Sequence, residues 1–519
     1  MNYETLKSLS HELIEIKNYL IAYLFIIIVF SFSFFTLEDY LNPEFEIAII
    51  IVLLILGTLS LLYYNKNTKS LHKVAFFIIL SFGILCLFTS PINDICDEQE
   101  HFTRSEIVSQ GEILTNYVQI PGTDVFGYET IKSISILASS AGLNVFNTDV
   151  DDKKINFTSD YQNSAFSQNP FYGYLPQAFG IFIAKMLDLN VIWMMWLGRF
   201  FNLLLYGSIC AVAIKKAPIF KVPLIIASCI PIAIYQGASM SIDSTINAFS
   251  ILSIGYFLYM FDSQDKSINW KEILIFFSAC LLAGIIKAPY LLLGFLLYLV
   301  PKEKFKTFNQ YIVSRIGIFF AFIIGALWNL GYASSELKNS WRGEYFTTNN
   351  ISTENQINYI VNNPQESIPR FLQIGNTIPE TFNRFFYFSN TALREYSSNL
   401  LGVLYAIFFG IFSVVYPSSI EINLSNRAKL LLITGSIYIS TFIIQYLTWA
   451  PIGSENLMDG VFGRYFIPLL AFIPLIIGIN YNENINFLNI EKNKLNLTLI
   501  TLIVGFIAGM ILLTIGVKY

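Results

Sequence analysis

The sequence predicts an all-α polytopic membrane protein with about thirteen transmembrane helices, and three observations support this. Hydrophobic residues make up 54% of the 519 residues and charged residues only 13%, whereas soluble domains carry about 25% charged residues. Long apolar runs recur along the chain, and a spanning helix needs about 20 such residues. Lysine and arginine gather between alternate runs, which is typical of a chain that crosses a membrane repeatedly.

The apolar runs define the expected spans in order. One further stretch, 171–187, fits either a span or a helix lying in the membrane interface, and the run 288–301 is short for a span. The expected spans are 18–37, 46–64, 73–90, 191–213, 219–237, 244–261, 271–286, 288–301, 311–333, 399–416, 429–447, 464–480 and 497–517.

Basic residues at the ends of spans predict the orientation, because cytoplasmic loops are enriched in Lys and Arg. All the basic groups fall on the cytoplasmic side, together with the N-terminus, if thirteen runs cross and 171–187 does not. These groups are Lys66, Lys69, Lys73, Lys215, Lys216, Lys302, Lys304, Lys306, Arg427, Lys429, Lys492 and Lys494. The protein is therefore expected in the cell membrane.

Two large loops, 91–170 and 334–398, then face the extracytoplasmic side. The first holds twelve acidic residues and four basic ones. Neither loop has sustained apolar alternation, so we expect short helices and loops on the membrane surface. Three divisions follow: 1–72 with two added spans, a membrane core at 73–480, and 481–519 with a cytoplasmic loop and the last span.

Composition also excludes some classes of function. No stripe of clustered Lys and Arg marks a nucleic-acid partner, and the formal net charge is −4. Of the five cysteines only Cys96 lies outside an apolar run. No disulfide framework or CxxC metal site is therefore predicted.

A polar cluster follows the apolar run 73–90 and is the first candidate site. Asp97, Glu98, His101 and Arg104 have helical spacing, so a helix would bring Asp97, His101 and Arg104 to one face. The alternative is a solvated helix start with Asp94 as its N-cap, because acids are favoured in a first turn.

Ionisable residues at or within other spans point to the same side of the membrane. Arg199, Asp243, Lys287 and Arg464 are costly in a bilayer unless they face a cavity or a partner. Their convergence at outer ends suggests one outward-open cavity. Each has an alternative: Arg199 and Asp243 could only neutralise each other, Lys287 could snorkel to the interface, and Arg464 could be an interfacial anchor.

An ordered set of motifs resembles the bacterial membrane proteins of domain-of-unknown-function family 2142, which in turn resemble GT-C glycosyltransferases. The first motif departs from the family in having Ile95-Cys96 where a proline often precedes Asp-Glu, and the last in having Val461-Phe462 where a glutamine is usual. The motifs are Asp97-Glu98-x-x-His101-Phe102-x-Arg104, Tyr172-Gly173-Tyr174-Leu175-Pro176-Gln177, Gly198-Arg199-x-x-Asn202, Pro231 through Gln236 to Asp243, Lys287-x-Pro289-Tyr290, Asn363-Pro364 and Gly463-Arg464-Tyr465-Phe466.

The resemblance implies an enzyme that moves a sugar from a polyprenyl-phosphate-linked donor to an extracytoplasmic acceptor, such as a surface polysaccharide, teichoic acid or lipid glycan. Asp97 or Glu98 would act as base, while Arg199, Lys287, Arg464 and Arg104 would bind the donor phosphate. The expected substrate pocket comprises His101, Tyr172, Tyr174, Gln177, Asn202, Gln236, Asp243, Tyr290 and Tyr465.

No cofactor is required in this interpretation; a divalent cation such as Mg²⁺ or Mn²⁺ would use Asp94, Asp97 and Glu98 as oxygen ligands. Three other interpretations stay open: a transporter or flippase for lipid-linked glycans, a polymerase or ligase that takes lipid-linked oligosaccharides, and a non-catalytic scaffold. Transporters commonly contain inverted repeats with broken helices, and no such pair is evident in the sequence.

Overall fold

A computed structural model describes residues 10–35, 42–386, 393–416, 422–457, 460–478 and 491–519. The expected span ends at 36–37 and 479–480, and the segments 1–9 and 481–490, lie outside these ranges.

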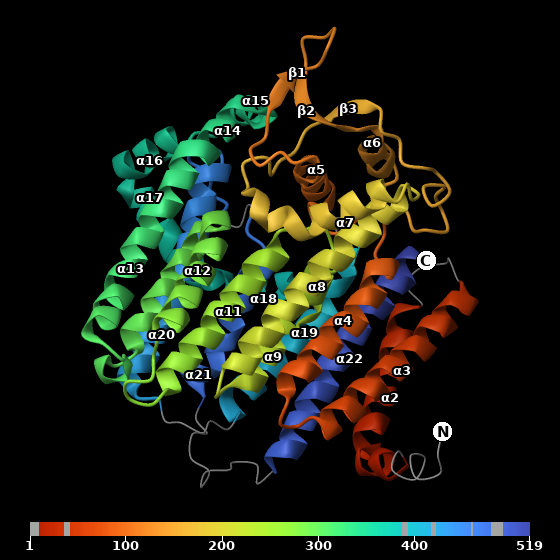
Figure 1. Cartoon of the computed structure of the whole chain (residues 1–519), viewed down its shortest axis with the longest axis vertical. Coiled ribbons are helices and arrows are strands. Elements are labelled where there is room, and N and C mark those ends of the chain that lie inside the picture. Colours follow the sequence, from red (N-terminus) through yellow and green to blue (C-terminus); the bar gives the residue numbers. More distant parts are fainter. Residues whose placement is uncertain (1–9, 36–41, 387–392, 417–421, 458–459, 479–490) are drawn as a thin grey trace.

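Within the described residues, eight helices are long and apolar enough to cross a membrane. They run roughly along the long axis of the molecule, and the loop elements gather at one end (Figure 1). One of the eight is continuous through α13 (Phe308–Ala326), the π-helical η4 (Leu327–Ala333) and α14 (Ser334–Asn339). The other seven are α2 (Lys17–Phe34), α3 (Pro43–Lys66), α4 (Leu71–Thr89), α8 (Ile192–Lys216), α11 (Asp243–Asp262), α20 (Leu424–Trp449) and α22 (Lys492–Lys518).

The other predicted spans also coincide with helical segments, although these are shorter or broken. The run 219–237 is divided because Ile230 is extended and Pro231 begins a new helix, and proline has no N–H to continue the previous one. The count of thirteen crossings stays a prediction. The segments are α9 (Lys221–Ser228), α10 (Pro231–Gly237), α12 (Trp270–Ile286), η2 (Ala288–Leu299), α19 (Leu393–Val415), η7 (Gly463–Phe472) and α21 (Ile473–Ile477), with the short η3 (Lys302–Lys304) in a turn.

The stretch 171–187 forms η1 (Phe171–Tyr174) and α7 (Leu175–Met186). Helix α7 lies across the ends of the bundle helices rather than along them (Figure 1). Its exposed face is an apolar stripe at helical spacing, formed by Leu175, Phe179, Phe182 and Met186. Such a stripe on a helix lying across the bundle is typical of the membrane interface, so the interface alternative fits this stretch.

The first large loop forms a cap on one end of the bundle. Its elements are α5 (Glu98–Ser109), β1 (Tyr117–Gln119), β2 (Phe126–Ile131), α6 (Lys132–Ser139) and β3 (Ser159–Gln162), and the strands pair antiparallel in the order β1-β2-β3. The expectation of helices and loops alone was wrong here. Burial along β2 does not alternate, so the strand leaves no period-2 signal in the sequence.

The second large loop consists of short helices, as expected. They are α15 (Trp341–Thr348), α16 (Thr353–Asn362), α17 (Pro364–Leu372), η5 (Gln373–Thr377), α18 (Ile378–Asn383) and η6 (Arg384–Phe386). At the end of α14, Glu336 accepts hydrogen bonds from Thr115 Oγ1 at 2.9 Å and from Tyr128 Oη at 2.5 Å. The first loop is thereby fastened to the helix that leads into the second loop.

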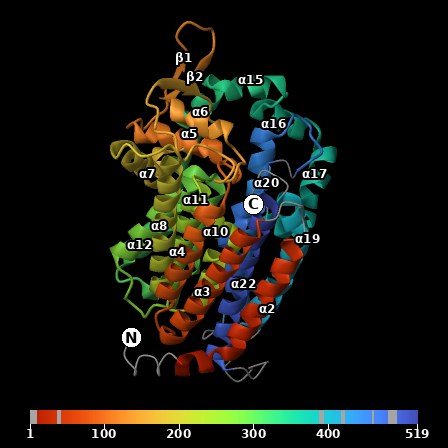
Figure 2. The ribbon, with the colours of Figure 1, turned by 90° about the vertical axis from the view of Figure 1, so that its right-hand side faces the viewer.

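Helix α22 packs against α2, α3, α4 and α19, and Figure 2 shows it among these helices. Tyr235 Oη and Thr514 Oγ1 are 2.6 Å apart inside the bundle. At the cap, Asn144 Nδ2 donates to the Lys518 carbonyl at 2.6 Å. The last helix therefore joins the N-terminal helices to the first loop.

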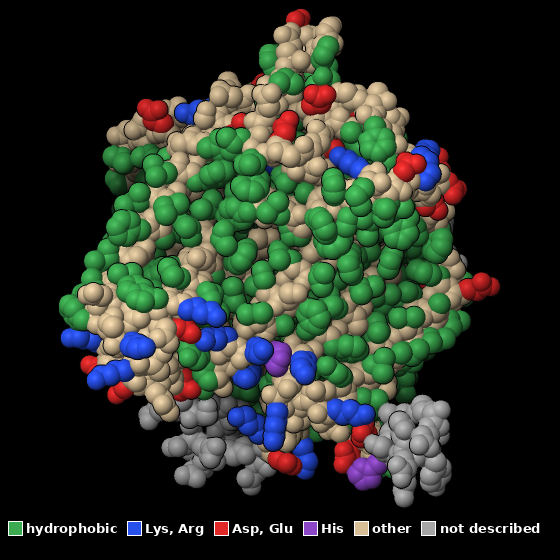
Figure 3. All heavy atoms as spheres, in the orientation of Figure 1, with side chains coloured by type: hydrophobic (Ala, Val, Ile, Leu, Met, Phe, Trp, Pro, Cys, Tyr) green, Lys and Arg blue, Asp and Glu red, His purple; other side chains and the backbone are tan. Residues whose placement is uncertain are grey.

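Side-chain types sort along the long axis. In Figure 3 a broad hydrophobic surface covers the middle of the molecule, and Lys and Arg side chains gather toward the end opposite the sheet. A surface of this kind is typical of a protein embedded in lipid with its positive loops on one side.

Candidate functional site

The polar cluster begins at a left-handed residue. Asp97 has φ 63° and precedes α5, and Asn93 earlier in the same turn has φ 49°. Non-glycine residues adopt this region at a conformational cost. The turn aims the neighbouring carboxylates of Asp97 and Glu98 at different arginines.

Glu98 and Arg199 form a fully buried ion pair. Arg199 Nε donates to Glu98 Oε1 at 2.8 Å and Nη2 donates to Oε2 at 2.7 Å, and neither side chain is exposed. The other three guanidinium N–H groups donate to the carbonyls of Leu87, Ser90 and Pro91, so all five are used. Glu98 Oε1 also accepts from Met240 N.

This pair differs from the one the sequence suggested. Arg199 contacts Glu98 and not Asp243, so the Arg199–Asp243 pairing was wrong. The N–H groups of Arg199 are all committed to protein acceptors, and its predicted role in phosphate binding would require breaking them. The pair instead fixes the turn before α5 against α8.

Arg464 joins Asp97 to Asp243 and forms the centre of the candidate site. Arg464 Nη2 donates to Asp97 Oδ2 and Nε donates to Asp243 Oδ2, both at 2.7 Å. The Arg464 side chain is 2% exposed, against 40% for Asp97. An interfacial-anchor role for Arg464 was therefore wrong. Its Nη1 atom is buried and has no hydrogen-bond partner among the described residues.

Lys287 contributes a second cation beside this centre. It ends α12, and its ammonium group lies over the ring of Tyr465, a contact that favours a cation. Within the described residues no carboxylate lies within ion-pair distance of Lys287. Tyr290 Oη donates to the Tyr465 carbonyl at 2.5 Å. The predicted pocket residue Tyr290 thereby holds the backbone next to Arg464.

His101 lies one turn along α5 from Asp97. Its ring stacks on Phe166 with centroids 4.1 Å apart, and its Nδ1 is 2.8 Å from Tyr174 Oη. Burial lowers the pKa of His101 to about 4, since desolvation disfavours the charged imidazolium. At neutral pH His101 is therefore an uncharged spacer and hydrogen-bonding group.

Arg104 lies on the same helix but points into the cap. Its Nη2 donates to the carbonyls of Ile113 at 2.9 Å and Asn169 at 3.3 Å, and its side chain is completely buried. Arg104 forms no hydrogen bond or ion pair with Asp97 or Arg464. The structure therefore separates Arg104 from the other residues predicted to bind the donor phosphate.

Three other predicted pocket residues, Gln177, Asn202 and Gln236, are buried around the turn before Asp243, and Tyr172 is half-buried against α12. Gln177 Nε2 donates to the Met240 carbonyl at 3.3 Å, and Asn202 Nδ2 donates to the Ser239 carbonyl at 2.7 Å. Gln236 is fully buried, and Tyr172 Oη donates to the Leu282 carbonyl at 2.8 Å. The hydrogen bonds from Gln177 and Asn202 hold the turn that precedes Asp243. A direct contact of these pocket residues with a sugar stays a prediction.

Two residues near the site were not predicted as members of it. Arg342 of α15 lies over the Trp449 ring at 4.6 Å, and its Nε atom is buried with no hydrogen-bond partner in the part of the chain that the structure describes. Glu100 accepts a hydrogen bond from Ala165 N at 2.5 Å. Burial raises the pKa of Glu100 above its usual value, although the hydrogen bond from Ala165 and the charge of Arg342 act in the opposite direction. Glu100 lies within the polar cluster itself, whereas the only sequence signal for Arg342 was the Trp341-Arg342 pair in the second loop, which has no spacing relation to Asp97.

The three acids considered for a metal are held apart by different cations. Asp94 lies 3.5 Å from Lys518 Nζ, Asp97 contacts Arg464, and Glu98 contacts Arg199. Over the described ranges, no three His, Cys, Asp or Glu side chains converge as metal ligands would. The donor set therefore does not fit a site built from Asp94, Asp97 and Glu98.

Together the apolar helices, the interfacial helix and the buried charges beneath a polar cap define a multi-pass membrane protein. Residues 80–473 match a family described as "Predicted membrane protein (DUF2142)", and the chain belongs to this family. The matched range contains every residue of the candidate site but neither α2 nor α3 nor α22. No curated protein and no solved structure matches the chain.

Proposed function

We propose that this protein is an integral membrane glycosyltransferase that moves a sugar from a polyprenyl-phosphate-linked donor to an extracytoplasmic acceptor. One observation carries the proposal. Asp97 offers a partly exposed carboxylate that is ion-paired to a buried arginine whose Nη1 atom has no partner among the described residues. A base and a phosphate-binding cation are the two groups that this transfer needs side by side.

The roles follow from which groups remain available. Asp97 orients the acceptor hydroxyl and takes its proton as the acceptor oxygen bonds to the anomeric carbon of the sugar. The bond from that carbon to the phosphate oxygen breaks, and the lipid phosphate leaves with an added negative charge. Arg464, Lys287 and Arg342 are the cations that meet this growing charge, because Lys287 lies over Tyr465 and Arg342 interacts electrostatically with Asp97 and Tyr465. Among the described residues, Nη1 of Arg464 and Nε of Arg342 have no hydrogen-bond partner.

The Glu98–Arg199 pair has a different role in this proposal. Because every N–H of Arg199 is already bonded, the pair positions Asp97 without touching the substrate. We therefore assign the base to Asp97 and not to Glu98. No metal is assigned a role.

Two further features support an extracytoplasmic site reached from the bilayer. Lys and Arg gather at the opposite end of the molecule (Figure 3), the end expected in the cytoplasm. The apolar stripe of α7 is exposed and α7 lies beneath the cap (Figure 1), which supports a membrane interface at the depth of Tyr174 and His101. A lipid-linked phosphate reaches this depth without leaving the bilayer.

The test uses a strain that lacks the gene and carries wild-type protein, Asp97→Asn or Asp124→Asn. Asp124 lies at the exposed tip of the β1–β2 hairpin and is the matched control. We expect Asp97→Asn to lower surface glycosylation by about 100-fold or more and to accumulate the polyprenyl-phosphate sugar, both measured by mass spectrometry. Equal membrane levels of the three proteins exclude loss of folding.

Three outcomes would contradict parts of the proposal. Full glycosylation with Asp97→Asn would remove Asp97 from the chemistry. Glycans of normal composition but altered length would favour a polymerase or ligase. Donor that accumulates only on the cytoplasmic side would favour a flippase.

A further inference from the structure

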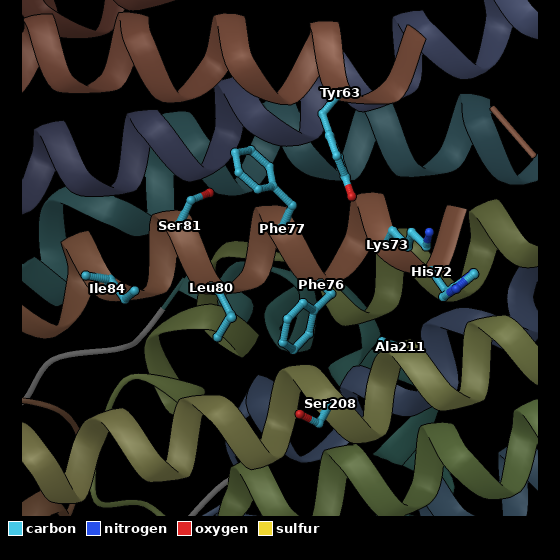
Figure 4. Close-up of a pocket in the computed structure, with 10 residues that line it drawn as sticks. All are labelled: Tyr63, His72, Lys73, Phe76, Phe77, Leu80, Ser81, Ile84, Ser208 and Ala211. Carbon is cyan, nitrogen blue, oxygen red and sulfur yellow. The ribbon is translucent and has the colours of Figure 1, made fainter. Parts of the chain in front are cut away.

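A groove opens on the lipid-facing surface between α4 and α8, toward the end opposite the candidate site. It has a volume of about 610 Å³. Figure 4 shows Phe76 and Leu80 pointing from α4 toward Ser208 of α8, with His72 and Lys73 at one end. Tyr63 of α3 borders the groove on the other side of α4, where its ring lies 5.2 Å from that of Phe77.

The groove exists because small and large side chains alternate at this helix contact. Ser208 and Ala211 leave space on α8, while Phe76 and Leu80 form apolar walls on α4. A polar ligand would gain little from such walls. A hydrocarbon chain fills them without leaving a buried polar group unpaired.

Uncompensated positive charge lies at one end of the groove. Lys215 lies one turn beyond Ala211 on the same face of α8, and Lys73, Lys215 and Lys221 all interact electrostatically with His72. Among the described residues, no carboxylate lies within ion-pair distance of these three lysines. By contrast, the neighbouring Lys216 pairs with Glu272 at 3.2 Å.

We propose that this groove is a binding site for an anionic phospholipid of the leaflet opposite the candidate site. The lipid phosphate lies among Lys73, Lys215 and Lys221, and one acyl chain lies between α4 and α8. Basic residues at the membrane surface attract anionic headgroups, and the apolar walls hold the chain. The inference does not depend on the proposed function, because groove and site lie at opposite ends of α4 and α8.

The test measures phospholipid retained by the purified full-length protein. Wild-type protein is placed in nanodiscs of equal parts phosphatidylglycerol and phosphatidylcholine, extracted in mild detergent and analysed by native mass spectrometry. We expect more phosphatidylglycerol than phosphatidylcholine to remain bound to the protein. The combined variant Lys73→Gln, Lys215→Gln, Lys221→Gln should lower that preference roughly tenfold.

A matched control removes the same charge elsewhere on the same side. Lys271, Lys302 and Lys306 are exposed, and the combined variant Lys271→Gln, Lys302→Gln, Lys306→Gln should keep the preference. Ala211→Trp should displace the acyl chain without changing any charge. Equal loss in both triple variants, or retention of phosphatidylcholine as well as phosphatidylglycerol, would overturn the proposal.

A further arm separates the phospholipid from a polyprenyl phosphate. Undecaprenyl phosphate is added in place of phosphatidylglycerol to the same variants. The phospholipid assignment would be overturned if retention of undecaprenyl phosphate fell in the combined Lys73→Gln, Lys215→Gln, Lys221→Gln variant but not in Arg464→Gln. Retention that falls with Arg464→Gln alone leaves the groove to the phospholipid.

Discussion

Two neighbouring carboxylates in one turn are used in opposite ways. Glu98 is sealed in a bidentate pair with Arg199, while Asp97 keeps 40% of its side chain exposed and shares Arg464 with Asp243. Asp97 has a left-handed conformation just before α5, whereas Glu98 is the first residue of that helix. The residue pattern predicted both acids as catalytic candidates, and only the paired arginines distinguish them.

Breaking the buried pair should cost stability more than it changes chemistry. Removing one partner of a buried ion pair typically costs about 3–5 kcal/mol, so Arg199→Met should lower the thermal unfolding temperature in detergent substantially. The double variant Glu98→Leu, Arg199→Met leaves no unpaired charge and should recover much of that loss. If Glu98→Gln unfolds like wild type yet has no activity, Glu98 takes part in the chemistry.

His101 predicts a pH dependence of stability. Its pKa is about 4 in the folded protein and about 6.5 when unfolded, so the unfolded state binds more protons between these values. Stability should therefore fall as pH drops from about 6.5 to about 4, by about 3 kcal/mol in total. Above pH 7, the titration of His101 should not change the stability of the protein.

The measurement compares thermal unfolding of wild type and His101→Gln across this range. The variant should show a shallower decline between pH 6.5 and 4, because glutamine does not titrate. Parallel curves for the two proteins would show that another group causes the decline.

At the scale of elements, apolar runs predicted helices well because a run of about 20 apolar residues has few other stable forms in lipid. The positions at which these apolar helices are interrupted were harder to predict. Pro231, Pro289 and Pro468 interrupt helical hydrogen bonding locally, yet the surrounding apolar pattern continues across each one. The sheet was missed because burial along β2 does not alternate, so its short strands leave no period-2 pattern in the sequence.

A close helix contact explains how α7 is held across the bundle. A Cβ atom on Gly180 would lie 2.3 Å from the backbone carbon and oxygen of Leu197 in α8. Gly180→Ala should therefore push the helices apart and destabilise the protein by about 1–3 kcal/mol.

Gly435→Ala is the matched control, because no atom lies within 4 Å of a Cβ built there on α20. This variant should be neutral or slightly stabilising, since alanine favours a helix over glycine. Thermal unfolding of both variants in detergent measures the difference. Equal effects would show that the α7–α8 contact adjusts freely.

At the scale of the whole molecule, charge predicts orientation while packing decides which charges meet. Basic loops predict that 91–170 and 334–398 lie on one side. In the structure the first loop and α15 lie at the same end (Figure 1), whereas α18 of the second loop contacts Tyr438 in the middle of α20. The contact of Asp97 with Arg464 joins residues 367 positions apart, and no spacing rule reaches that far. Arg342 was missed for the same reason.

The orientation can be measured with single cysteines. All five native cysteines are buried, whereas Thr123 at the hairpin tip and Asp265 between α11 and α12 are exposed on opposite ends. A membrane-impermeant thiol reagent should label Thr123→Cys in intact cells and Asp265→Cys only after permeabilisation. The reverse pattern would invert the topology and move the candidate site to the cytoplasm.

The position of α22 has a consequence for the order of assembly. This helix follows every other element in the chain, yet it is the most buried of the eight long helices. Until it enters the membrane, α2 and α4 lack their contacts with α22, and Asp94 and Asn144 lack their contacts with Lys518. Insertion during synthesis therefore leaves the turn beside Asp97 without these contacts until α22 has been translated and inserted.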